Sequence, residues 1–241
     1  MDFQLPTEIV KLPTQGLIYP SDNPLSSGEV EIKYMTAKEE DILTNANYIN
    51  EGTVLDKLMK SLIVSDINYN DLLIGDKNAI MVASRILGYG KDYKFTYQGE
   101  EQTVDLTTLE NKEINPINYT QGENSFDFTL PTSGIDIKFK FLTHGDEVRI
   151  SQELKGLKKL NSENSPELTT RLKHMIISVN GSSEKKDIRQ FVENYLLAQD
   201  ARALRNYISE IQPDVDLTFF HERTESKTRL PIGLNFFWPD I

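Results

Sequence analysis

The chain has 241 residues, no cysteine and a formal net charge of -11, and 38% of its residues are hydrophobic. The length allows one large or two medium domains, and the acidic balance argues against a nucleic-acid groove or a site for an anionic membrane, since both need a basic face. Disulfides and cysteine-ligated metal sites are excluded. No apolar run approaches the roughly 20 residues of a membrane span, and the polar start does not fit a secretory signal, so we expect a cytosolic protein.

A short string near the N-terminus returns in the middle of the chain. Leu12-Pro13-Thr14-Gln15-Gly16 recurs as Leu130-Pro131-Thr132-Ser133-Gly134, and later landmarks follow in the same order at offsets between 107 and 124. Pro and Gly at these places favour an entry turn. The pattern predicts an α+β fold with an internal duplication of a turn–strand–helices–β-hairpin unit. We assign residues 1–114 to the first unit, 115–122 to a linker and 123–241 to a second unit with an aromatic C-terminal tail.

Each predicted unit begins with a half-buried strand that leads into a helix. Apolar and polar residues alternate in both strands, with the apolar set at Val30, Ile32 and Tyr34 in one and Ile137, Phe139 and Phe141 in the other. Thr36 and Glu39 have the spacing of a capping box, and Thr143 and Asp146 form a weaker version 107 residues later. The neighbouring acidic residues Glu40, Asp41 and Glu147 favour a helix start, although an acidic catalytic or metal-binding cluster is an alternative interpretation.

Two amphipathic helices are expected next in each unit. The first covers Val54–Ile63, and its counterpart begins at Ser165-Pro166-Glu167 and carries an apolar stripe from Leu168 to Val179. The second opens after Asp76 and stops at Gly88, and its counterpart runs from Asp200 until Pro213 ends the pattern.

A β-hairpin closes each predicted unit. In the first unit the strands are 92–97 and 104–109, and in the second they are 216–221 and 230–238. Residues 161–165 are expected to form an exposed loop.

No residue pattern in the chain specifies catalysis. His144, His174 and His221 lie outside recognisable nucleophile or metalloprotease motifs, and Gly88-Tyr89-Gly90-Lys91 lacks the spacing of a phosphate-binding loop. No calcium-binding loop pattern occurs. We therefore predict a protein that is not an enzyme and has no cofactor, metal or small-molecule substrate. Lys155, Lys158 and Lys159 form either a local basic patch or a solvated helix end.

The C-terminus concentrates aromatic residues at the end of an otherwise acidic, polar chain. Aromatic side chains are enriched in protein interfaces because they bury much area with few rotatable bonds. The sequence therefore nominates a protein interface, although packing of the last strand on its own domain is the competing interpretation. The candidate interface residues are Phe236, Phe237, Trp238 and Pro239.

Several of these segments together resemble a known family. The residues that carry the likeness are the Leu-Pro-Thr-x-Gly-Leu-Ile-Tyr-Pro run that begins at Leu12, the stretches 28–36, 66–73, 75–80 and 85–90, and the closing Pro-Ile-Gly-Leu-Asn-Phe-Phe-Trp-Pro-Asp. In this combination, which covers nearly the whole chain, the protein resembles the baseplate hub subunits of T-even-type contractile-tailed bacteriophages.

The resemblance implies a structural subunit of the tail baseplate, in the virion, that is made and assembled in the host cytoplasm. It would act as a scaffold or adaptor whose partners are other baseplate or hub proteins, without nucleic acid or membrane. An assembly chaperone that is absent from the mature virion is the alternative. Some family members are expected to carry a zinc site of paired cysteines in the hairpins. Here those hairpins, Tyr97–Glu100 and Phe220–Arg223, have no cysteine, so zinc is not carried over and we expect cross-strand packing to hold them.

Overall fold

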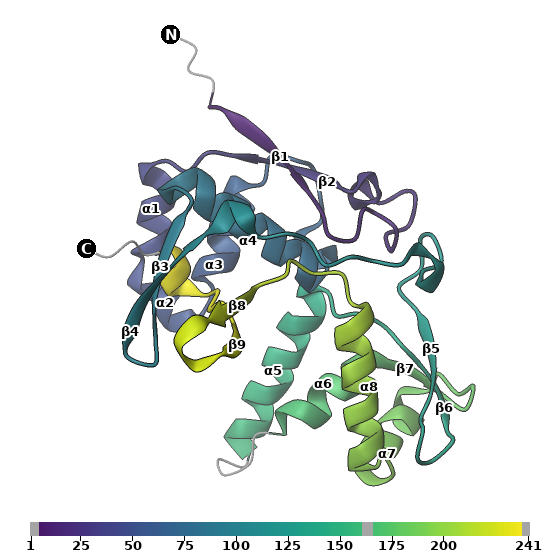
Figure 1. The fold of residues 1–241 in the computed structure, drawn as a ribbon. Coiled ribbons are helices and arrows are strands. Elements are labelled where there is room, and N and C mark those ends of the chain that lie inside the picture. The colour runs from purple at the N-terminus through teal and green to yellow at the C-terminus, as the bar shows by residue number, and fades with distance from the viewer. Residues whose placement is uncertain (1–4, 161–165, 238–241) are drawn as a thin grey trace.

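The computed structural model describes residues 5–160 and 166–237, and it confirms the predicted α+β class (Figure 1). The described residues form helices and four small antiparallel sheets. The first half of the chain contains β1 (Thr7–Lys11), β2 (Glu29–Lys33), α1 (Ala37–Leu43), α2 (Ala46–Glu51), α3 (Val54–Leu62), α4 (Ile74–Tyr89), β3 (Asp92–Tyr97) and β4 (Glu100–Asp105). The second half contains β5 (Phe126–Thr129), β6 (Asp136–Phe139), α5 (His144–Leu160), α6 (Glu167–Met175), β7 (Ile176–Val179), α7 (Lys185–Asn194), α8 (Ala198–Ile211), β8 (Thr218–His221) and β9 (Ser226–Arg229).

The Leu-Pro-Thr element forms the predicted entry turn between β1 and β2. Gln15 and Gly16 have φ values of 51° and 77°, in the left-handed region that favours glycine. A Cβ on Gly16 would lie 2.2 Å from the carbonyl oxygen of Ser26, so a side chain cannot fit there. The turn sends the chain back through β2, whose Val30 and Ile32 are buried as the alternation predicts.

Helix α1 in the first half and helix α5 in the second begin with the expected cap, and in each the capping acid also pairs with a lysine. The capping box of Thr36 and Glu39 is present at the start of α1. At α5 the backbone N–H of Thr143 donates to Asp146 at 3.0 Å, and the N–H of Asp146 donates back to the Thr143 hydroxyl at 3.2 Å. Each capping carboxylate also pairs with a lysine from the preceding strand segment, Lys33 with Glu39 at 2.9 Å and Lys140 with Asp146 at 2.7 Å.

The second-half helix predicted to reach Val179 is shorter than the apolar stripe suggests. α6 ends at Met175, and Ile176–Val179 form β7, which pairs with β6. Burial in this segment has the two-residue period of a strand, with Ile176 and Ser178 inside, because the open edge of β6 supplies the backbone partners. Ser165, the predicted cap, lies outside the described residues, as does the loop expected at 161–165.

The prediction that Gly88 ends the first long helix is wrong. α4 continues to Tyr89 and ends before Gly90, which has φ of 81°. Gly88 instead allows close packing, because a Cβ there would lie 2.9 Å from the terminal methyl of Met35. The helix also begins earlier than expected, at Ile74 after Leu73, with no side-chain cap.

Both hairpins form, with strand boundaries that differ from those expected. The first turns at Gln98 and Gly99, so its second strand is β4 and not residues 104–109. In the second, β9 ends at Arg229, and the strand expected over 230–238 is absent from the described part of that segment. Leu234–Phe237 form a single 3-10 turn, η6. The Pro231 and Gly233 that flank Ile232 are poor strand residues, which accounts for the difference.

The end of the chain returns to the first half. Asn111 and Val215 form a β-bridge, and the backbone N–H of Lys112 donates to the carbonyl of Asp214 at 2.8 Å. Beyond this crossing, β8 and β9 lie beside β3 and β4, as the yellow and teal ribbons in Figure 1 show. One hydrophobic core therefore runs through both halves. The boundary at 115–122 stays a prediction; within it Ile117 is 90% exposed.

None of the helices in the described residues is long and apolar enough to cross a membrane.

Candidate protein-binding surfaces

The aromatic tail packs against the first half of the molecule. Phe236 and Phe237 are buried, and the Phe236 ring meets that of Tyr93 edge-on at 4.8 Å. The buried Arg85 guanidinium donates to the carbonyl of Phe236 at 2.8 Å. These two predicted interface residues therefore have an intramolecular role, whereas Trp238 and Pro239 lie outside the described residues. A partner-facing role for the tail stays a prediction.

Aromatic contacts join the two hairpins. Phe219 of β8 lies edge-on to Phe95 of β3 at 5.1 Å, and His221 lies against Tyr97 at 5.2 Å. Ring edges carry partial positive charge and ring faces partial negative charge, so these arrangements are attractive beyond the area they bury. The two hairpins are thus held together by packed rings.

His144 belongs to a polar cluster that joins the two halves. Its Nδ1 lies 3.3 Å from the Lys77 ammonium, its Nε2 lies 3.6 Å from Asp56, and its ring stacks at an angle on Tyr69 at 4.5 Å. Burial, followed by the positive charge of Lys77, lowers the pKa of His144. A neutral imidazole therefore sits at the start of α5, where its contacts fix that helix to α3 and α4.

The backbone reinforces this junction. The N–H of His144 donates to the carbonyl of Leu72 at 2.7 Å, and the N–H of Ile74 donates to the carbonyl of Leu142 at 3.3 Å. The sequence predicts that His144 lies at a helix start, but it does not indicate that Asp56, Tyr69 and Lys77 surround it. These residues are far apart in sequence, so no local spacing predicts the cluster.

The other histidines are placed apart from this cluster. His174 Nε2 lies 3.0 Å from Glu153, and His221 Nδ1 lies 2.7 Å from the Thr224 hydroxyl. Over residues 5–160 and 166–237, no group of three or more His, Asp or Glu side chains is arranged to hold a metal ion.

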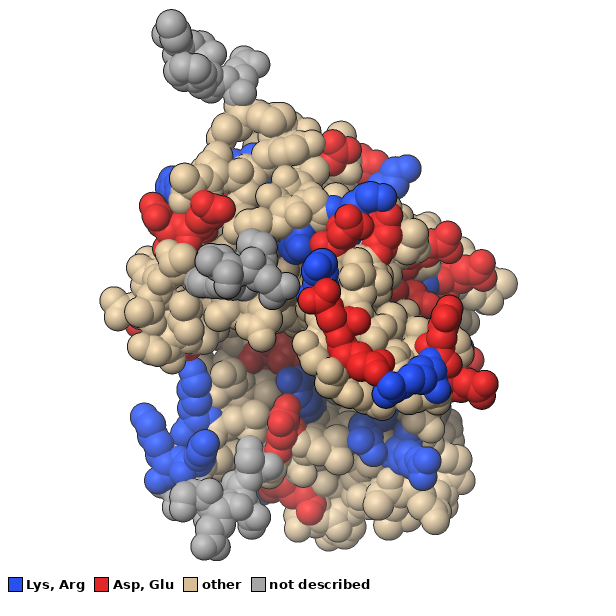
Figure 2. Space-filling view, turned by 60° about the vertical axis from the view of Figure 1, so that its left-hand side comes forward, with Lys and Arg blue, Asp and Glu red and all other residues tan. Residues whose placement is uncertain are grey.

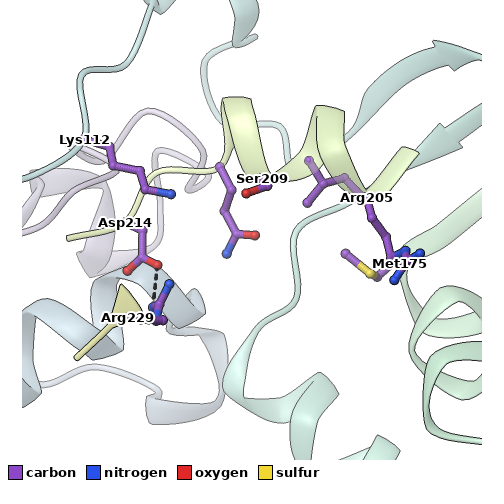
Figure 3. A pocket seen from close by; sticks show the side chains of 8 residues that line it. Lys112, Met175, Arg205, Ser209, Asp214 and Arg229 are labelled. Carbon is purple, nitrogen blue, oxygen red and sulfur yellow. Dashed lines mark hydrogen bonds and ion pairs between the residues drawn. The ribbon is translucent and has the colours of Figure 1, made fainter. Parts of the chain in front are cut away.

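A pocket of about 240 Å³ opens between the halves, beside the chain crossing (Figure 3). Asp214 lies at its edge and accepts from Arg229 at 2.9 Å and from Asn78 at 2.8 Å. Lys112 enters from the segment after β4 and Arg205 from α8, and Met175 at the end of α6 supplies an apolar surface. The arrangement suits a small anionic or polar group, and the Asp214 contacts stabilise the crossing itself.

Comparisons with known proteins place the chain in one family. No curated protein and no solved structure matches it. The family model described as T4 bacteriophage base plate protein matches residues 17–230, which include every β-strand and helix from β2 to β9. The chain belongs to the T4 bacteriophage base plate protein family.

Proposed function

We propose that this baseplate protein is a structural subunit of the hub region and acts as a scaffold or adaptor between neighbouring baseplate proteins. The observation that carries the proposal is the return of residues 214–237 to the first half, together with the His144 cluster. These two connections join the halves through one core. A body joined in this way holds its outer surfaces at fixed separations, which is what an adaptor needs if it is to set the spacing of its neighbours.

We further propose that the two halves descend from a duplicated unit. Supporting this, each Leu-Pro-Thr turn is tied to an aspartate in the first turn of a long helix. The backbone N–H of Thr14 donates to Asp76 at 3.0 Å, and that of Thr132 donates to Asp200 at 2.7 Å. The ion pairs between a lysine and a helix-capping acid also correspond: Lys33 with Glu39 in the first half matches Lys140 with Asp146 in the second, at an offset of 107 residues. Two related halves would offer related but distinct contact surfaces to neighbouring subunits.

Quantitative mass spectrometry of purified virions tests the structural role. A structural subunit is expected at a fixed stoichiometry relative to other baseplate proteins, in intact particles and in isolated baseplates. Presence in assembly intermediates but absence from intact particles would overturn the structural role in favour of an assembly chaperone. An unrelated phage purified from host cells that express this chain from a plasmid provides the matched control for carry-over from the host lysate.

A further inference from the structure

The second half contains a groove whose walls are basic, which we call the basic groove. It lies between α5 and α7, and its volume of about 640 Å³ makes it larger than the pocket at the chain crossing. The apolar part of its lining, which we call its floor, consists of Ile176, Ile177 and Ile188, of which Ile176 and Ile188 are buried and Ile177 is partly exposed. Its walls carry Lys140, Arg149, Lys173, Lys185 and Arg189, against the two carboxylates of Asp146 and Glu153.

The ion pairs inside the basic groove leave positive charge in excess. Asp146 is buried, and it accepts from both Lys140 and Arg149 at 2.7 Å. Glu153 accepts from Lys173 at 2.9 Å and from His174 at 3.0 Å. Glu193 also pairs with Lys173 and Arg189, at 3.2 Å each. Three acids therefore face the five cations of the groove lining, and the excess positive charge remains available to a further acid.

Two guanidinium groups lie at the mouth of the basic groove. The side chains of Arg149 and Arg189 are both 61% exposed, although they come from different helices. Arg189 of α7 reaches towards α5 and lies 3.9 Å from Glu153. Arginine presents several N–H donors in a flat fork that matches a carboxylate, so this pair is suited to bind acids from two sides.

The N-terminus of α7 adds to the positive potential of the mouth. This helix begins after Glu184 without a side-chain cap, and its first two residues are Lys185 and Lys186. Acidic residues are the favourable choice at a helix N-terminus, where free N–H groups and the helix dipole attract negative charge. Asp187 supplies such an acid in the first turn of α7, so the contribution of this helix end to the groove is the exposed ammonium of Lys185 in its lining.

The two halves differ strongly in charge. Residues 1–122 contain 19 Asp and Glu against 10 Lys and Arg, whereas residues 123–241 contain 18 against 16. On the face drawn in Figure 2, acidic side chains gather on the right-hand side, and a basic group separate from the basic groove lies at the lower left, over the end of α5. A basic groove within an acidic protein is therefore a local feature of the second half.

We propose that the basic groove binds an acidic segment of another baseplate protein. Carboxylates of that segment would pair with Arg149, Arg189 and Lys185, and an apolar side chain between them would cover Ile177 on the floor. The inference rests on the proposed adaptor function and specifies one contact surface and the chemistry of its partner.

The groove favours a protein segment over a nucleic acid for two reasons. Its apolar floor matches an aliphatic side chain, whereas a phosphate backbone offers no apolar group to place there. The net charge of -11 would also repel a long polyanion that extends beyond the groove, but it would tolerate a short acidic segment.

Fluorescence anisotropy with the purified full-length chain tests the proposal. The probe is a short labelled synthetic peptide of Glu and Leu, compared with a peptide that has Gln in place of every Glu and with an oligothymidylate of equal charge. We expect the Glu peptide to bind at least about tenfold more tightly than the other two probes, with an affinity that falls as salt increases. Equal binding of the Glu and Gln peptides would overturn the proposal, as would tighter binding of the oligothymidylate.

Charge reversal assigns the binding to the basic groove. Lys185→Glu combined with Arg189→Glu is expected to weaken binding of the Glu peptide by at least about tenfold, since two attractions become repulsions. Lys155→Glu combined with Lys158→Glu changes the net charge equally on exposed positions of α5 outside the groove, and it should retain most of the affinity. Equal loss in both double variants would mean nonspecific attraction and overturn the assignment. Lys185→Gln combined with Arg189→Gln gives a milder test if the reversed variant unfolds.

The two proposals fail in distinguishable ways. If the Glu peptide does not bind but the chain is present at fixed stoichiometry in virions, only the basic groove assignment is overturned. If the peptide binds through the groove but the chain is absent from virions, the groove proposal is supported for an assembly partner and the structural role is overturned.

Discussion

Asp76 and Asp200 hold matching positions, each in the first turn of a long helix with its carboxylate accepting the backbone N–H of a Leu-Pro-Thr threonine. Their surroundings differ. Asp76 also accepts the hydroxyls of Thr14 at 2.8 Å and Tyr19 at 2.6 Å, and Thr14 and Tyr19 are themselves buried. Asp200 accepts a further backbone N–H, from the exposed Ser133 at 3.1 Å. The two carboxylates should therefore contribute unequally to stability.

Asp76→Ala should destabilise the protein far more than Asp200→Ala. Removing Asp76 leaves three buried donors without an acceptor, which costs about 3–5 kcal/mol of unfolding free energy. Water can replace the acceptor lost in Asp200→Ala, so that variant should lose about 1 kcal/mol. Chemical denaturation monitored by circular dichroism measures both values. Similar losses in the two variants would contradict the unequal roles inferred for the two turns.

Glu39 should make stability depend on pH in the acid range. Burial opposes its ionisation, but hydrogen bonds from Thr36, Lys33 and Ser61 outweigh that effect and lower the pKa of Glu39 from 4.5 to about 2. A pKa depressed on folding contributes stability that is present above about pH 4.5 and is lost as the pH falls towards about 2.

The comparison of wild type with Glu39→Gln isolates this contribution. The difference in unfolding free energy should be largest above about pH 4.5 and should shrink as the pH falls, because Gln does not titrate. Denaturation midpoints of both proteins, measured at several pH values between about 2 and 4.5, test this expectation. A difference that stays constant with pH would mean that the amide and the carboxylate make equivalent contacts. Asp146→Asn should show the same direction, since the pKa of Asp146 is also lowered.

The features that were predicted correctly from the sequence are those set by nearby residues. The caps at Thr36 and Thr143 require only a hydroxyl and an acid three positions later, and the buried strand of Val30 and Ile32 requires only alternation. The prediction of a longer helix at Ile176 failed because the neighbouring strand β6 competes for its backbone hydrogen bonds. No propensity within the segment reveals that partner.

The candidate surfaces were harder to predict than the fold. The nominated tail residues Phe236 and Phe237 are core residues, because the chain crosses back to the first half, and a linear pattern does not show that crossing. No linear pattern predicts the basic groove, because its cations come from separate elements. The basic pattern that is visible in the sequence, the consecutive Lys158 and Lys159, lies on α5 outside the groove. The spacing of Lys140 and Asp146, which repeats that of Lys33 and Glu39, is the one local signal that touches the groove.

Gly75 should be among the least replaceable positions. A Cβ there would lie 1.9 Å from the carbonyl oxygen of Pro213, where α4 meets the end of α8. Gly75→Ala should therefore force the halves apart and cost about 3 kcal/mol. Gly156→Ala is the matched control: Gly156 is also helical, but a Cβ there meets nothing within 4 Å, so alanine should stabilise α5 by about 0.5–1 kcal/mol. Thermal unfolding distinguishes the two, and a neutral Gly75→Ala would refute the close approach.

Two truncations separate the structural from the partner-binding role of the tail. Deleting residues 236–241 removes Phe236 and Phe237 from the core and takes away one of the three carbonyl acceptors of the Arg85 guanidinium, so the free energy of unfolding should fall by about 3–5 kcal/mol or more. Deleting only 238–241 keeps both phenylalanines and the Phe236 carbonyl that accepts from Arg85, so these contacts remain available in the shorter chain. If the tail also binds a partner through Trp238 and Pro239, the shorter deletion should reduce incorporation into baseplates. Denaturation curves and complementation of gene-deficient phage, measured on the same variants, provide the test. Normal incorporation after the shorter deletion would refute the partner-binding role and leave the tail with its packing role alone.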